Sequence, residues 1–178
     1  MTYQIKLKLS DYLAHQLYSA SISERVKKRK RRSWVLFPVA LFLLGILFVQ
    51  QQNGMGTGYF IAGIIWAIGY PFYFKWAYKR HFSKYVKDNF STKAGQTVEL
   101  SIGDDYLFSK DEDSEAKIRL HLFHSFVELP EHILLRTKKG DTLIIPKSMT
   151  YFDQLNIELK EKANEYSIEW NNQLDWGW

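Results

Sequence analysis

The feature that most constrains this chain is a block of 42 consecutive residues, 33–74, without a single Asp, Glu, Lys or Arg. It holds most of two apolar runs, SWVLFPVALFLLGILFV at 33–49 and YFIAGIIWAIGYPFYFKW at 59–76. A helix of 17 or 18 residues is roughly 26 Å long, close to the ~30 Å hydrocarbon thickness of a bilayer. Both runs are apolar on every face, unlike a helix that covers a soluble core. The sequence therefore predicts a transmembrane helical hairpin with the glycine-rich segment 50–58 as its turn.

Positive charge is concentrated on the two flanks of this block. Residues 1–32 have a net charge of +7 and residues 75–95 of +5, whereas residues 96–178 have −7. Basic flanks stay on the cytoplasmic side, so both termini are expected there and the turn outside. Each cation near the surface also attracts anionic headgroups by about 1 kcal/mol. The residues expected to set topology and face the lipid are Lys27, Lys28, Arg29, Lys30, Arg31, Arg32, Lys75, Lys79 and Arg80. Because the cations flank an apolar block and do not cover a folded domain, nucleic acid is not an expected partner.

The remaining segments predict an α+β cytoplasmic domain. Tyr3, Ile5, Leu7 and Leu9 alternate with polar residues, which predicts a half-buried strand, and Ser10 is the expected cap of the following helix. That helix is expected to run on into the basic cluster. Six short strands are predicted at 98–102, 106–108, 118–122, 125–130, 132–137 and 142–146, followed by a helix over 148–166. The predicted fold is a pleckstrin-homology-like antiparallel barrel or sheet of about seven strands with a C-terminal capping helix.

Four parts of the chain follow from this pattern. Residues 1–32 are a strand and juxtamembrane helix, 33–76 the membrane hairpin, 77–95 a helical extension, and 96–178 the β-rich domain with its C-terminal helix.

The order of these parts resembles the YcxB-like family of small bacterial membrane proteins. The closest local similarity is FHSFVELPEHILLRTKKGDTLIIPKSM, Phe123 to Met149. It is similar to the family's aromatic-led strand ending in Val-Glu, apolar strand, turn, and strand closing on Ile-Pro-Lys. The chain has Phe123 or Leu122 where the family pattern has a tryptophan. The resemblance implies this fold and a bacterial inner-membrane location, and it implies no chemistry because the family has no established activity.

No residue set in the sequence indicates catalysis, a cofactor or a metal. The chain has no cysteine, which excludes disulfides and thiolate chemistry. His121 and His124 would point to opposite faces of one strand, and the acidic segment 111–115 lacks the spacing and mid-loop glycine of a calcium loop. The KKGD segment at 138–141 lacks the flanking residues of a phosphate loop. The other histidines, His15, His81 and His132, are expected at surfaces or interfaces.

The chain ends in a tryptophan-rich tail with Trp170, Trp176 and Trp178. These residues are either a partner-contact patch, or Trp170 packs on the domain and the last two are loosely ordered. The expected function is a non-enzymatic binding or regulatory module, one version being immunity against a membrane-active toxin. The alternatives are an anionic-lipid sensor or an accessory subunit of a membrane transporter or enzyme complex. A protein partner is expected but not specified, and a homo-oligomer is left open.

Overall fold

The computed structural model describes residues 2–49, 54–112 and 114–178. The chain forms two compact units. One, here the β-rich unit, consists of Met1–His15 and Tyr85–Gly177, and the other, the helical unit, consists of Gln16–Lys84 with Trp178. Residues 50–53 of the predicted turn and Asp113 lie outside the described residues.

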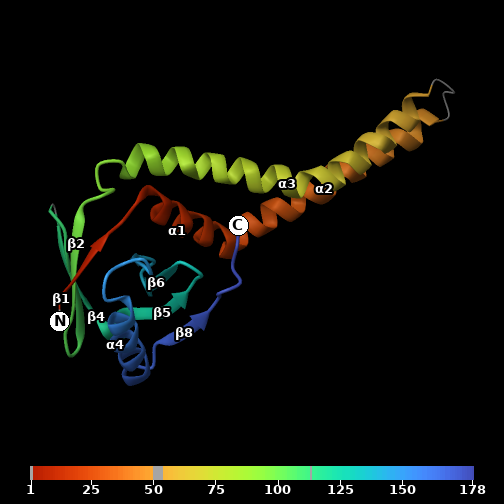
Figure 1. Cartoon of the computed structure of the whole chain (residues 1–178). Coiled ribbons are helices and arrows are strands. Elements are labelled where there is room, and N and C mark those ends of the chain that lie inside the picture. Colours follow the sequence, from red (N-terminus) through yellow and green to blue (C-terminus); the bar gives the residue numbers. More distant parts are fainter. Residues whose placement is uncertain (1, 50–53, 113) are drawn as a thin grey trace. The chain divides into compact units, whose positions relative to one another are not determined.

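The helical unit is built on two long helices, α2 at Glu24–Val49 and α3 at Met55–Phe90 (Figure 1). Both are long and apolar enough to cross a membrane, and only 11% and 17% of their most apolar stretches are buried. A core helix of a soluble protein would be mostly buried, so these helices present apolar side chains to a surrounding medium. The continuous α3 agrees with the predicted helical extension beyond residue 76.

A break at Ser23 separates α2 from helix α1 at Leu9–Ile22. The Ser23 carbonyl accepts a hydrogen bond from the Lys27 N–H at 3.0 Å, and its hydroxyl lies 3.5 Å from the Val26 nitrogen. Ser23 therefore caps a new helix, because its side chain satisfies a backbone donor that has no partner within that helix. The prediction of one helix running into the basic cluster was wrong.

Helices α2 and α3 pack through aromatic rings and small residues. The Trp34 indole N–H donates to the Ala67 carbonyl at 2.8 Å, and Phe42 lies 5.8 Å from Phe60 between ring centroids. A Cβ atom at Gly45 would come within 2.9 Å of the Phe60 ring. At Gly56 it would lie 2.6 Å from the Val49 nitrogen. The two backbones approach closely at positions that only glycine permits.

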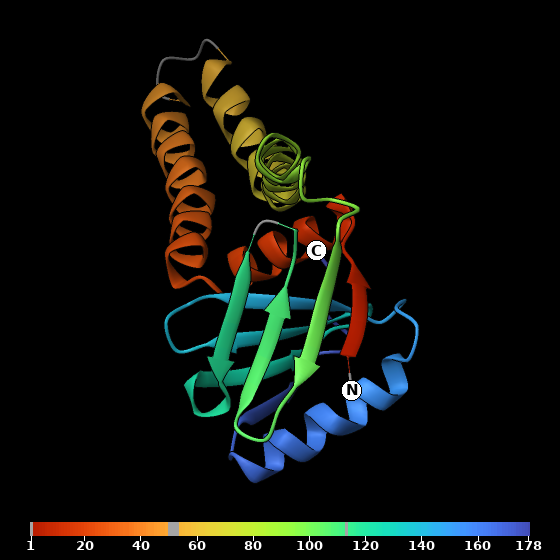
Figure 2. The ribbon, with the colours of Figure 1, turned by 90° about the vertical axis from the view of Figure 1, so that its left-hand side faces the viewer.

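The β-rich unit contains two four-stranded sheets and helix α4, together with the start of α1 and the end of α3 (Figure 2). The first sheet has the order β1-β2-β3-β4, formed by Thr2–Lys6, Thr97–Ile102, Tyr106–Lys110 and Glu115–Arg119. The second has the order β7-β6-β5-β8, formed by Thr142–Pro146, His132–Thr137, Phe123–Glu128 and Glu169–Asn172. Helix α4, Phe152–Glu165, lies between β7 and β8 in the chain.

The N-terminal strand belongs to the first sheet, as its alternation predicted. Ile5 lies opposite Val98 in the antiparallel pair β1–β2. The strand's inward side chains are buried, and the Tyr3 hydroxyl donates to Glu158 of α4 at 2.8 Å. The fully buried core joins both sheets and the helix: Ile5, Leu100, Leu107, Leu120, Phe126, Leu129, Ile133, Leu134, Leu135, Ile145, Leu155 and Leu159.

The α+β layout and the C-terminal helix agree with the prediction, but the single seven-stranded barrel was wrong. A 3-10 turn at Leu120–Leu122 separates β4 from β5, so these consecutive strands enter different sheets. This turn also ends the strand that was predicted to extend to 122. An eighth strand, β8, pairs in parallel with β5, although all strands were expected to be antiparallel.

Candidate functional site

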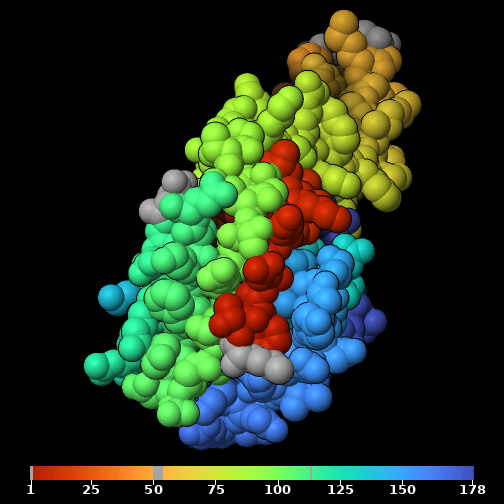
Figure 3. Space-filling view, turned by 60° about the vertical axis from the view of Figure 1, so that its left-hand side comes forward, coloured from red at the N-terminus to blue at the C-terminus, as the bar shows by residue number. Residues whose placement is uncertain are grey.

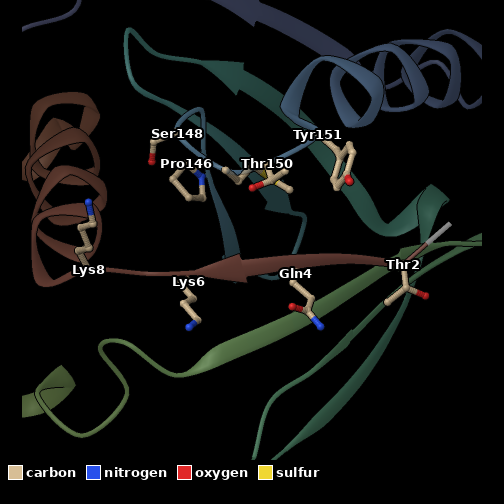
Figure 4. A pocket seen from close by; sticks show the side chains of 9 residues that line it. Thr2, Gln4, Lys6, Lys8, Pro146, Ser148, Thr150 and Tyr151 are labelled. Carbon is tan, nitrogen blue, oxygen red and sulfur yellow. The ribbon is translucent and has the colours of Figure 1, made fainter.

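The main candidate site is a groove of about 610 Å³ along strand β1 in the β-rich unit. One wall is the outward face of β1, with Thr2, Gln4 and Lys6, continued by Lys8 just before α1. The other wall is the segment that leaves β7, with Pro146, Ser148, Met149, Thr150 and Tyr151 (Figure 4). In the space-filling view β1 lies at the surface as a red band between the green strand atoms and the blue C-terminal atoms (Figure 3). We call this feature the β1 groove.

Strand β1 is an edge strand, since among the described residues it pairs with β2 alone. The Leu7 carbonyl accepts a hydrogen bond from the Gly95 N–H on the β2 side. Backbone groups of successive residues in a strand point to opposite edges, so those of Tyr3 and Ile5 point to β2 as well. The N–H and C=O groups of Gln4 and Lys6 therefore point to the free edge, where another extended segment can pair with them.

The groove is lined by two basic side chains and by no acidic one. Lys6 and Lys8 are both exposed, and no carboxylate is among the lining residues. Neither lysine takes part in an ion pair with any other described residue. Glu99, opposite Gln4 on β2, is the nearest acidic residue in the strand register. Of the remaining lining side chains, those of Thr2, Gln4, Ser148, Thr150 and Tyr151 offer hydroxyl and amide groups, which suits a polar, anionic occupant, and Pro146 and Met149 are apolar.

Tyr151 ends the second wall in an unusual backbone conformation. Its φ is +65°, in the left-handed region, and its side chain is 66% exposed. This conformation costs a non-glycine residue about 1–2 kcal/mol. It is held by the start of α4, where the Leu155 N–H donates to the Tyr151 carbonyl at 3.2 Å. The fold thus keeps a large, exposed aromatic side chain at the groove (Figure 4).

A buried polar pair fixes the Lys8 end of the groove. The His132 Nε2 lies 3.0 Å from Asp11 Oδ1, with Asp11 7% and His132 5% exposed. The other Asp11 oxygen accepts the Lys8 backbone N–H at 2.7 Å. An acidic residue at the third helical position that bonds back to the N-cap N–H is one half of a capping box. Asp11 therefore holds the end of β1 and the start of α1 against the first residue of β6.

Burial by itself acts to raise the pKa of Asp11, but it is outweighed. The hydrogen bonds from His132 and the Lys8 N–H, together with the charge of His132, keep the pKa below its ordinary 3.8. The carboxyl is therefore ionised throughout the neutral range. The pair is too buried to reach a substrate, so its role is structural.

The sequence had placed two of these residues differently. Ser10, not Asp11, was the expected cap of α1, and its hydroxyl instead donates to Asp11 at 3.2 Å. His132 was expected at a surface or interface and is buried. A histidine next to a proline turn gives no sign of burial, since its partner lies 121 positions away.

The predicted topology cations are distributed over α2 and α3. Five of the six in the basic cluster are exposed, and Lys30, half-buried, lies over the Phe74 ring at 5.5 Å. Lys27, Lys28, Arg31 and Arg32 line one face of α2 with Val35 and Leu36, whereas Arg29 lines another groove toward α3. On α3, Lys75 and Lys79 are exposed, and Arg80 lies over the Trp76 ring at 5.4 Å.

The tail tryptophans do not form one cluster. Trp170 lies in β8, where its indole N–H donates to Glu128 at 3.3 Å and Asn172 at 2.9 Å. The Trp176 backbone N–H donates to the Gln173 carbonyl at 3.1 Å. Trp178 belongs to the helical unit, with its indole N–H on the Lys75 carbonyl at 2.9 Å. A contact role for these residues remains a prediction.

The other sequence candidates lie at the surface. His121 and His124 are exposed, on the 3-10 turn and on β5. Asp111 accepts the Ser114 N–H at 2.6 Å in the turn between β3 and β4. Within 2–49, 54–112 and 114–178, no group of three or more His, Asp or Glu side chains is placed to hold a metal ion.

The sequence had identified the outward residues of β1 only as the polar side of a strand. The available signal for the groove was a pair of lysines, Lys6 and Lys8, at two consecutive outward positions. No family model, no curated protein and no solved structure matches the chain.

Proposed function

We propose that this protein is a non-enzymatic binding module, anchored in the membrane by α2 and α3, that holds an extended acidic segment of a partner protein in the β1 groove. The observation that carries the proposal is the free edge of β1, where outward backbone groups lie next to two unpaired lysines. Addition of a strand at such an edge supplies affinity through main-chain hydrogen bonds, and side-chain contacts add specificity. A groove of about 610 Å³ is within the usual size of a binding site.

The proposed location is the cytoplasmic face of a bacterial inner membrane with both termini inside. Support comes from the basic flanks of the two apolar helices and from the resemblance to the YcxB-like family. Single cysteines at Thr57 and Ser114 test the topology with a membrane-impermeant thiol reagent. In intact cells Thr57→Cys should react and Ser114→Cys should not. Labelling of Ser114→Cys without lysis would overturn the proposed orientation.

A photo-crosslinking side chain at Gln4 tests the groove in native membranes. We expect a protein crosslink whose captured peptide is acidic. Lys6→Glu should reduce the yield at least about tenfold, since it replaces a charge-assisted contact with repulsion. Lys139→Glu is the matched control, because this exposed lysine lies in the β6–β7 turn and does not line the groove. Its yield should stay within about twofold of the wild type.

A backbone variant separates strand pairing from charge alone. Gln4→Pro removes an N–H that faces the free edge, and an edge strand tolerates proline at such a position. The crosslink, now placed at Thr2, should be lost while the protein remains resistant to proteolysis. If Gln4→Pro and Lys6→Glu both give wild-type yields, the groove is not the binding site. A captured lipid in place of a peptide would likewise contradict the proposal.

One version of this function is self-protection, in which the bound segment belongs to a membrane-active toxin. In that version Lys6→Glu should abolish protection of cells that express the toxin, whereas His121→Ala and His124→Ala should leave it unchanged. A substitution that abolishes function without changing insertion, folding or partner binding would contradict the non-enzymatic assignment.

A further inference from the structure

Five aromatic residues at intervals of four form a ladder along α3. Trp66, Tyr70, Phe74, Tyr78 and Phe82 follow one another with ring centroids 5.3, 5.9, 4.2 and 6.0 Å apart. An interval of four residues keeps side chains on one helix face, so the rings make a continuous stripe. Tyr70 and Phe74 are buried. The stripe runs from the apolar run of α3 into its charged continuation.

The C-terminal part of this ladder, from Tyr70 to Phe82, lines a groove of about 600 Å³ between α2 and α3. Among its lining residues are Arg29 and Ser33 of α2 and Tyr70, Phe74, Tyr78 and His81 of α3. We call it the aromatic groove. All these residues belong to the helical unit.

The aromatic groove changes from polar to apolar along its length. Ser33 and Tyr70 lie in the uncharged block, whereas Arg29 and His81 lie in the flanks that carry the cations. In a bilayer these flanks lie at headgroup depth, where tyrosine rings are also favoured. The groove therefore offers a cation at one end and ring faces toward the hydrocarbon.

Arg29 is the charged anchor of the aromatic groove. No carboxylate lines the groove, and Arg29 makes none of the ion pairs found among the described residues. Ser33 is four positions further on, so its hydroxyl lies on the same side of α2. A guanidinium group binds phosphate oxygens with two parallel hydrogen bonds, which a lysine ammonium does not.

We infer that the aromatic groove binds one anionic diacyl phospholipid, with its phosphate on Arg29 and Ser33, its headgroup against the ring of Tyr78, and its glycerol and first acyl carbons on the rings of Phe74 and Tyr70. A bilayer lipid fits better than free phosphate, because the ladder continues from the cation into the apolar run. This inference shares with the proposed function the membrane placement of α2 and α3, but it does not involve the β1 groove. Besides the general attraction between the basic cluster and anionic headgroups, the inference thus assigns one specific lipid-binding site.

Native mass spectrometry of the full chain, released from vesicles of phosphatidylglycerol and phosphatidylcholine in equal amounts, tests the site. We expect one retained phosphatidylglycerol per chain. Arg29→Gln should reduce this retention about tenfold or more, the loss expected for a charge-assisted contact. Arg31→Gln is the matched control: it removes the same charge two residues away on the face that lies outside the groove.

A second pair of variants tests the ring contacts. Tyr78→Leu should lower retention several-fold, whereas Phe72→Leu, an exposed aromatic of α3 outside the groove, should leave it unchanged. Inorganic phosphate at millimolar concentration should not displace the lipid. Circular dichroism of each variant should match that of the wild type.

Equal losses in Arg29→Gln and Arg31→Gln would overturn the proposal in favour of non-specific attraction. Equal retention of the two lipids, or displacement by inorganic phosphate, would also overturn it. Lys6→Glu should leave lipid retention at the wild-type level. The lipid experiment therefore tests the aromatic groove independently of the proposed peptide binding in the β1 groove.

Discussion

Replacing Asp11 by alanine should destabilise the β-rich unit far more than replacing its neighbour Ser10. Asp11 accepts the Lys8 N–H at 2.7 Å, and loss of this helix-capping bond costs about 1 kcal/mol. The substitution also leaves the 5%-exposed His132 without its carboxylate partner. An unsatisfied buried polar group costs about 1–3 kcal/mol. The expected loss in the free energy of unfolding is therefore about 2–4 kcal/mol.

Ser10→Ala removes only a 3.2 Å hydrogen bond from an exposed hydroxyl to the same carboxylate. Its expected effect is within about 0.5 kcal/mol. Pulse proteolysis of the full chain in detergent, over a urea series, gives the free energy of unfolding for each variant. The urea midpoint at which the β-rich unit becomes cleavable is the quantity compared.

A double-mutant cycle with His132→Ala isolates the coupling between the two buried residues. Removing both partners eliminates the unsatisfied group, so the double variant should be more stable than the sum of the single losses implies. A coupling free energy of about 1–3 kcal/mol is expected. Strict additivity, or an effect of Asp11→Ala no larger than that of Ser10→Ala, would refute the buried pair.

The pH dependence provides an independent check of the same pair. Because the pKa of Asp11 is lowered by folding, its contribution is present above the unfolded value of 3.8 and is lost as the pH falls through the folded value. The contribution of the ionised Asp11 carboxylate, measured as the stability difference between wild type and Asp11→Ala, should therefore shrink as the pH falls below about 4. A difference that does not shrink at the acid end of the series contradicts the assigned ionisation.

Four further variants have defined outcomes. Burial, and to a lesser extent the charge of Arg136, lowers the pKa of His15 below 6.5. The stability of the wild type should therefore fall as the pH drops below that value. His15→Gln should show a smaller fall in the urea midpoint over the same pH range. Burial and the hydrogen bond to Glu158 raise the pKa of Tyr3 to about 12. The contribution of Tyr3 to the free energy of unfolding is therefore full below pH 10 and is lost as the pH rises toward 12. Tyr3→Phe should cost about 1 kcal/mol of stability at neutral pH and remove this loss at alkaline pH. Gly56→Ala should lower the thermal midpoint in detergent because a Cβ would lie 2.6 Å from the Val49 nitrogen, whereas Gly58→Ala, which meets no atom within 4 Å, should keep or raise it.

Much of the fold could be predicted because its signals are local. Apolar runs on every face predicted the two long helices, and alternation predicted β1 and the six strands β2–β7 to within a few residues. The alternation of Tyr3 and Ile5 also required a sheet partner, which β2 supplies. The secondary-structure predictions were wrong where a local pattern was compatible with two structures. Leu120–Leu122 has the composition of a strand but forms a turn, and Ser23 interrupts a helix that the apolar pattern would allow to continue.

The sequence by itself determined which segments are apolar, which alternate and which side of β1 is polar, because these depend on neighbours in the chain. Only the tertiary structure decided that β8 joins β5 in parallel, that Asp11 meets His132, and that the 146–151 segment lies along β1 to form a groove. Periodicity reports which face of an element is buried, but it carries no information about the partner that buries it. Asp11 and His132 lie 121 positions apart, and the burial of a polar side chain is favourable only when such a distant partner satisfies its hydrogen bonds.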